Sequence, residues 1–134
     1  MMFTNVHHGT YLVEDTDEMA NYLENNFGLK PSSRGEHPDR KYIIYHIGPT
    51  IMDFFEPTTP DSSIARQLKD SGPGVAHVAW GVDEIDQVFK KLKTNGNRMR
   101  GESPSTSPFG YKTLNIDTSS SHGILFQLAE GEES

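Results

Sequence analysis

The sequence contains the same strand-and-helix pattern twice. Residues 74–93 alternate small and apolar side chains like a strand, and then place apolar residues at helical spacing. Residues 6–27 repeat this order, and in the best superposition His8 falls on His77 (77 − 8 = 69). A repeat of this length constrains the chain to fold as two similar modules.

The C-terminal parts of the two halves also correspond. Residues 41–55 and 111–129 each read as two strands joined by a turn. Asp53 then falls on Gln127 (127 − 53 = 74). Each half therefore follows the order strand, helix and about three strands.

We predict an α+β fold in which two βαβββ modules, residues 3–57 and 74–130, form one cupped mixed sheet. The whole chain of 134 residues is then a single domain. The segment between the modules contains several prolines and reads as a linker with a short helix near residues 62–69. Residues 103–110 read as a flexible loop that covers a cavity, with Phe109 and Tyr111 touching a substrate.

Local signals set the ends of the two long helices. The acidic, cap-rich residues 14–17 begin the first helix, and Gly28 ends it. Asp83 is expected to cap the second helix, and Gly96 to end it in the left-handed conformation.

Composition excludes several classes of function. The formal net charge of −7 argues against a basic nucleic-acid-binding surface. The absence of cysteine excludes disulfides, zinc–thiolate sites and cysteine nucleophiles. No apolar run approaches membrane length and no signal pattern opens the chain, so we expect a cytoplasmic protein.

Four side chains hold equivalent positions in the two halves. His8 and His77 lie on the first strand of each half, and Asp53 and Gln127 lie on the last. If the halves pack with twofold pseudosymmetry, two imidazoles, a carboxylate and an amide oxygen converge. Such donors suit a divalent cobalt, nickel, manganese, zinc or iron ion.

Each of these residues also has a simpler structural interpretation. A single histidine in a strand is usually structural, and Gln127 alone is an ordinary strand residue. His7 competes with His8, but His7 shares its face with apolar residues expected to be buried, which favours His8. Asp53 stands among apolar neighbours, where a carboxylate is costly unless it is paired or bound to a metal.

The sequence resembles the vicinal oxygen chelate superfamily, which includes glyoxalase I, extradiol dioxygenases and bleomycin-sequestering proteins. Within it, the chain is most similar to the methylmalonyl-CoA epimerases, and the resemblance extends over nearly its full length. The residues that carry it are Val6–His8 with Asp15, Asp53–Ala65, Gly74–Asp86 and Gly123–Leu128.

The resemblance implies a four-ligand metal site at His8, Asp53, His77 and Gln127 that holds an acyl-CoA as a chelated enolate. Two of these residues depart from the family pattern. Asp53 stands where the family has Glu or Gln, and Gln127 replaces a Glu that also acts as a catalytic acid/base in related enzymes.

A second acid/base of the epimerases lies in the loop that here contains Glu36 and His37, and either residue is a candidate. Because Gln127 cannot titrate, a two-base epimerisation is in doubt.

We therefore predict a metal-dependent isomerase or epimerase that moves a proton alpha to a carbonyl, with methylmalonyl-CoA or a similar acyl-CoA as substrate. The catalytic candidates are Glu36, His37 and Gln127. The alternatives are a lyase or an iron(II) dioxygenase of the same superfamily, or a non-catalytic small-molecule binding protein. We expect a homodimer with no nucleic-acid or membrane partner.

Overall fold

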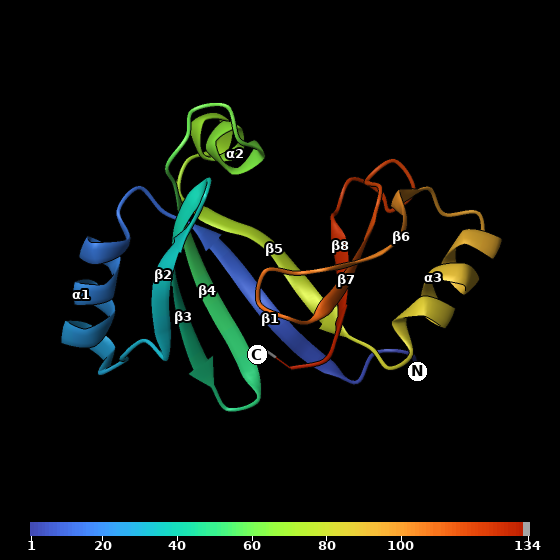
Figure 1. The fold of residues 1–134 in the computed structure, drawn as a ribbon, viewed down its shortest axis with the longest axis horizontal. Helices are drawn as coiled ribbons and strands as arrows, with labels where there is room; N and C mark the ends of the chain where they lie inside the picture. Colours follow the sequence, from blue (N-terminus) through green and yellow to red (C-terminus); the bar gives the residue numbers. More distant parts are fainter. Residues whose placement is uncertain (133–134) are drawn as a thin grey trace. The chain divides into compact units, whose positions relative to one another are not determined.

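A computed structural model describes residues 1–132 of the chain. It contains helices and strands in the order β-α-β-β-β twice, with one additional helix between the repeats, which confirms the α+β class (Figure 1). The elements are β1 (Asn5–Leu12), α1 (Thr16–Phe27), β2 (Ser33–His37), β3 (Arg40–Ile47), β4 (Thr50–Pro57), α2 (Ser63–Ser71), β5 (Gly74–Gly81), α3 (Ile85–Thr94), β6 (Met99–Thr106), β7 (Lys112–Ile116) and β8 (Phe126–Glu130).

The chain divides into two compact units. The first unit comprises residues 8–76, and the second comprises residues 1–7 together with residues 77 onward. None of the helices within residues 1–132 combines the length and the apolar character that a membrane crossing requires.

In the first unit, four strands are hydrogen-bonded in the order β2-β3-β4-β1. β1 runs parallel to β4, and the remaining pairs are antiparallel. Helix α1 lies alongside the sheet and contacts β3 and β4 (Figure 1). Its residues Ala20 and Leu23 pack against Ile43, Tyr45 and Phe54. One face of this sheet is therefore covered by the helix.

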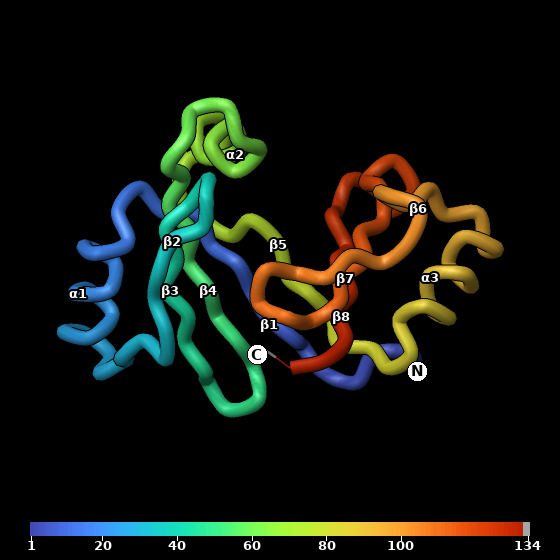
Figure 2. The backbone as a smooth tube through the Cα atoms, in the orientation of Figure 1, coloured from blue at the N-terminus to red at the C-terminus, as the bar shows by residue number. Residues whose placement is uncertain are grey.

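The second unit repeats the arrangement with the order β5-β8-β7-β6. β5 runs parallel to β8, and the other pairs are antiparallel. Helix α3 buries Ile85 and Phe89 against Leu114 and Leu128, and the N-terminal residues Met2 and Phe3 join this core. The backbone trace shows the N-terminus close to the start of α3 (Figure 2).

A carboxylate on the last strand of each unit holds the start of that unit's helix. Glu56 accepts hydrogen bonds from the Thr16 backbone nitrogen at 2.8 Å and from its hydroxyl at 3.2 Å. Glu130 accepts from the backbone nitrogens of Glu84 and Ile85 at 2.8 and 3.0 Å. These bonds satisfy amide groups that have no partner inside the helix and place negative charge at the positive end of its dipole.

The local signals in the sequence predict the first helix better than the second. The Asp15 side chain caps α1 by accepting from the Glu18 nitrogen, and Gly28 ends the helix with a φ of 69°, as expected. Asp83 does not cap α3. The N-cap is Glu84, which has a φ of 52° and makes no side-chain cap bond, because Glu130 bonds the backbone there instead.

The expected loop at residues 103–110 is partly wrong. Residues 103–106 belong to strand β6, which pairs with β7 on both sides of an irregularity between Arg100 and Ser105. The polar sequence of β6 lacks strand alternation, so its pairing partner decides its conformation. Asn95 is the C-cap of α3, and Gly96 follows it with a φ of 95°.

Candidate functional site

His8 and Asp53 share one face of the first unit's sheet. In the parallel pair of β1 and β4, Asp53 lies opposite Thr10, two residues after His8. Residues directly opposite each other, and residues two apart along a strand, point to the same face. His8 is 2% exposed and Asp53 is 1% exposed. The two side chains therefore occupy a buried surface on the face opposite α1.

His77 and Gln127 form the corresponding pair in the second unit. In the parallel pair of β5 and β8, Gln127 lies opposite Ala79, two residues after His77. Both side chains are half-buried. The amide nitrogen of Gln127 donates to the Asn115 side-chain oxygen at 3.2 Å, which leaves the amide oxygen of Gln127 as the available donor atom for a cation.

The two pairs are equivalent in register. Each histidine lies two residues before the strand partner of Asp53 or Gln127 (10 − 8 = 2 and 79 − 77 = 2). Among the described residues of either unit, no group of three or more histidine, aspartate or glutamate side chains is placed to hold a metal ion. Each unit taken alone therefore supplies a pair of donors.

The donor set fits a divalent cation chemically. Imidazole nitrogen suits zinc, nickel and iron, and a carboxylate also accepts harder ions such as manganese. Asp53 is fully buried, and an ionised carboxylate in such a position is strongly disfavoured unless positive charge compensates it.

Glu36 and His37 lie on opposite faces of their strand. Glu36 pairs with Lys41 on the face that α1 covers, and its side chain is exposed. His37 shares the other face with Tyr42, which lies two residues before the strand partner of Asp53. The rings of His37 and Tyr42 stack with centroids 4.9 Å apart.

Glycine at position 35 makes room for this stacked pair. A Cβ atom on Gly35 would lie 2.7 Å from the Tyr42 hydroxyl, closer than side chains tolerate.

Beyond His37, the turn into β3 contains Asp39, which forms a salt bridge with Arg40 at 2.8 Å. The hydrogen bond from Arg40 lowers the pKa of Asp39. The Asp39 and Arg40 side chains of this turn therefore hold each other in place.

His7 has structural partners of its own. Its Nε2 atom lies 2.7 Å from the Gly131 carbonyl oxygen, and its ring meets Tyr111 edge-on with centroids 4.7 Å apart. Tyr111 is 5% exposed and packs with Ala79 and Phe109. His7 therefore ties the residue that follows β8, and the residue that precedes β7, to the N-terminal residues of the same unit.

Sequence reasoning missed two residues of the candidate site. Asn115 orients the Gln127 amide, and Tyr42 supports His37. Both are cross-strand relationships that depend on the pairing register, and no local motif marks them. Superposing the repeats identifies the candidate ligand positions but not the neighbours that orient their side chains.

Comparison with known proteins gives a match over most of the chain. Residues 7–111 match the family model of the Glyoxalase/Bleomycin resistance protein/Dioxygenase superfamily. An ethylmalonyl-CoA/methylmalonyl-CoA epimerase of Cereibacter sphaeroides is 24% identical over 133 residues, which cover 96% of this chain and 99% of the relative.

Two further proteins extend the comparison. A 4-hydroxyphenylpyruvate dioxygenase of Xenopus tropicalis is 26% identical over 99 residues, 70% of this chain, but the match spans only 25% of the dioxygenase. The structure of a Streptomyces coelicolor methylmalonyl-CoA epimerase variant in complex with 2-nitronate-propionyl-CoA superposes with a TM-score of 0.87 at 20% identity. That superposition covers 96% of this chain and 98% of the epimerase.

Proposed function

Because the chain belongs to the glyoxalase/bleomycin resistance protein/dioxygenase superfamily, we propose that it is a metal-dependent isomerase of the methylmalonyl-CoA epimerase type. It removes and returns the proton on the carbon that is alpha to the carbonyl of methylmalonyl-CoA or a similar acyl-CoA. The full-length similarity to the Cereibacter sphaeroides epimerase supports this substrate class.

The observation that carries the proposal is the matched register of the two donor pairs. We assign His8 and Asp53 of the first unit, and His77 and Gln127 of the second, as ligands for cobalt, nickel, manganese, zinc or iron in the divalent state. When bound, such an ion would stabilise the negative charge that develops on the carbonyl oxygen. The protein residues themselves orient the substrate and carry the proton.

His37 is the proposed proton carrier. An imidazole accepts and donates protons near neutral pH, and His37 lies on the same sheet face as Asp53. The proton leaves the carbon alpha to the thioester and passes to a ring nitrogen of His37. Stacking on Tyr42 restrains the ring for this role. Glu36, on the α1 face beside Arg34 and Lys41, serves as the matched control.

Gln127 is the proposed neutral ligand. An amide does not exchange protons near neutral pH, so Gln127 cannot return a proton to the opposite face of the substrate carbon. Its hydrogen bond to Asn115 instead fixes the direction of its oxygen. With one effective base, the enzyme exchanges the alpha proton faster than it inverts the carbon.

The experiment follows deuterium uptake by (2R)- and (2S)-methylmalonyl-CoA in heavy water with added cobalt. We expect exchange of one epimer with little inversion. His37→Asn should lower exchange about 10²- to 10⁴-fold, whereas Glu36→Gln should leave it nearly unchanged. If Glu36→Gln has the larger effect, the base is Glu36. If neither epimer exchanges with any divalent metal, the epimerase proposal fails.

Two further variants test the ligand set. His77→Ala should remove metal from the purified protein, and retention of a full equivalent would place the site elsewhere. Gln127→Glu should raise inversion relative to exchange, because it restores a titratable carboxylate. Metal content by elemental analysis keeps the binding result independent of activity.

The match to a dioxygenase makes an oxygenase the second candidate. Iron(II) oxygenases use two histidines and one carboxylate, so Asp53 would have to supply the carboxylate here. Bound iron with oxygen uptake would favour this interpretation, and a protein that binds no metal would favour a small-molecule binding function.

A further inference from the structure

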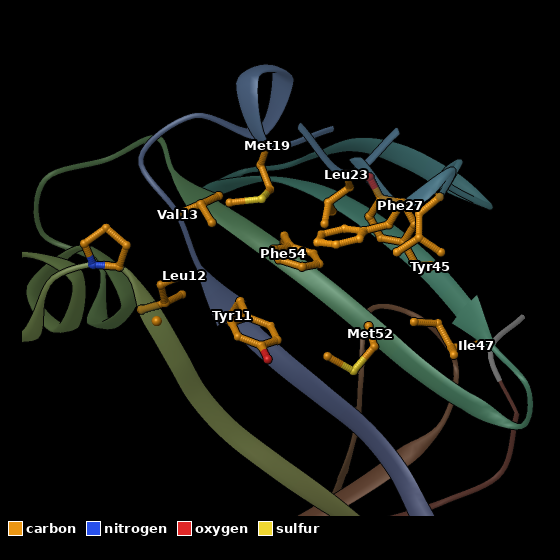
Figure 3. A pocket seen from close by; sticks show the side chains of 13 residues that line it. Tyr11, Leu12, Val13, Met19, Leu23, Phe27, Tyr45, Ile47, Met52 and Phe54 are labelled. Carbon is orange, nitrogen blue, oxygen red and sulfur yellow. The ribbon is translucent and has the colours of Figure 1, made fainter. Parts of the chain in front are cut away.

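The first unit contains a cavity on the sheet face that α1 covers. Its volume is about 480 Å³, within the range of about 300–1,000 Å³ found for small-molecule pockets. Met19, Leu23 and Phe27 of α1 lie on one side, and Tyr11, Met52 and Phe54 of β1 and β4 lie on the other (Figure 3).

This cavity is separate from the candidate ligand pair of the same unit. Tyr11 follows Thr10 on β1, and Met52 and Phe54 flank Asp53 on β4. Because neighbouring residues of a strand point to opposite faces, the cavity and the His8–Asp53 pair lie on the two sides of one sheet. Different ligands can therefore occupy them.

The lining of the cavity is mainly apolar. None of its described lining residues carries a charge. The rings of Tyr11 and Phe54 stack with centroids 5.0 Å apart, and the two methionines are side chains that adapt to differently shaped partners. These features favour an uncharged and largely apolar occupant.

The lining also contains a buried hydroxyl, that of Tyr45. This residue is 1% exposed, and within the described residues its hydroxyl oxygen has no hydrogen-bond partner. Burial raises the pKa of Tyr45, so the hydroxyl keeps its proton and remains a donor. A buried donor without an acceptor is costly. Because the lining covers this oxygen, an occupant that displaces a lining side chain and places an acceptor against it would remove that cost.

We propose that this cavity binds an uncharged, mainly apolar small molecule whose single carbonyl oxygen accepts a hydrogen bond from Tyr45. The exposed side chains of Phe27 and Ile47 belong to the lining and border its opening to solvent. A ketone or ester with a medium-length alkyl chain has this chemistry.

The test uses methyl-labelled methionine and NMR spectroscopy, with 2-nonanone as the probe. Met19 and Met52 line the cavity, while Met2 and Met99 pack in the other unit's core and serve as internal controls. We expect 2-nonanone to shift the Met19 and Met52 signals to saturation and to leave the control signals in place. The hydrocarbon n-nonane, which lacks the carbonyl, should bind more weakly.

Two variants make the test specific. Tyr45→Phe should weaken 2-nonanone binding about 2- to 10-fold, as expected for one lost hydrogen bond, and should leave n-nonane binding unchanged. Leu23→Phe narrows the cavity, keeps both reporter methionines and should weaken both probes. A cooperative thermal transition of each variant confirms that it is folded.

Several outcomes would overturn the proposal. One is the absence of any saturable shift at Met19 and Met52, and another is an equal shift at the control methionines. Unchanged 2-nonanone affinity in Tyr45→Phe would show that the carbonyl oxygen accepts no hydrogen bond from Tyr45. Shifts at Met19 and Met52 that follow protein concentration without probe, together with a dimer in sedimentation, would show that a second copy covers the cavity.

Discussion

The two units fill the space between helix and sheet in different ways. In the second unit, α3 contributes the ring of Phe89, and the sheet contributes the smaller Ile116. In the first unit, the helix position equivalent to Phe89 is Ala20 (89 − 20 = 69), and the sheet contributes Tyr45. At these equivalent positions, the aromatic ring comes from the helix in the second unit and from the sheet in the first.

This exchange has chemical consequences. Phe89 adds no polar atom to the core of the second unit, whereas Tyr45 adds a hydroxyl to the core of the first unit. The cavity lined by Tyr45 lies in the first unit. Two modules with the same element order can therefore differ in which layer, helix or sheet, supplies the aromatic ring at equivalent positions.

The largest expected effect is on the core of the second unit. Phe89→Ala should lower the free energy of unfolding by about 3–5 kcal/mol, because it removes a buried ring and leaves a cavity. Urea unfolding monitored by the fluorescence of Trp80 gives this value. A loss below about 1 kcal/mol would mean that the second core can collapse around the gap.

Copying the second unit's side chains into the first unit tests this difference directly. Ala20→Phe should cost about 1–3 kcal/mol, because Tyr45 already occupies that region. Adding Tyr45→Ile copies the second unit and should recover at least half of the loss. Strict additivity of the two changes would show that the positions do not share space.

The carboxylates at the helix starts should contribute similar amounts in the two units. Glu56→Ala and Glu130→Ala should each lower the free energy of unfolding by about 1.5–3 kcal/mol, since each leaves helix donors without their charged acceptor. Glu→Gln at either position keeps an acceptor and should cost less. A loss at only one position would break the equivalence of the repeats.

The smallest expected effect concerns the hydroxyl of Tyr45. Tyr45→Phe should leave stability at neutral pH unchanged or raise it by up to about 1 kcal/mol, because it removes a buried donor that lacks a partner among the described residues. Urea unfolding at about pH 7 measures this effect. A loss above about 1 kcal/mol would reveal a partner for the hydroxyl.

The same residue predicts a dependence on alkaline pH. Burial raises the pKa of Tyr45 in the folded state. The free energy of unfolding is therefore independent of this group's ionisation below the ordinary tyrosine pKa, and it falls as pH rises from there through the folded pKa. Wild-type protein should therefore lose more stability than Tyr45→Phe above about pH 10. Parallel loss in both proteins would contradict the shift.

Short-range patterns predict the parts of this fold that are determined locally. The Asp15 cap and the Gly28 end of α1 depend on neighbours within one helical turn, and both are readable in sequence. The start of α3 depends on Glu130, which lies 46 residues from Glu84. No local motif could distinguish that arrangement from a cap at Asp83.

The candidate site shows the same limit. Superposing the repeats locates His8 and Asp53 because the repeat itself is written in the sequence. Whether Glu36 or His37 shares their face is decided by the pairing of β2 with β3. A shift of one residue in that pairing would exchange the two side chains, so sequence alone leaves both open.

The N-terminal residues of the second unit have a consequence for synthesis. Phe3 stacks on Trp80 with ring centroids 5.2 Å apart, and the Thr4 nitrogen donates to the Gly81 carbonyl at 2.8 Å. A ribosome makes this segment before the first unit, but its partners Trp80 and Gly81 emerge only after that unit. The segment must therefore wait until the first unit has been made, and the second unit can close only afterwards.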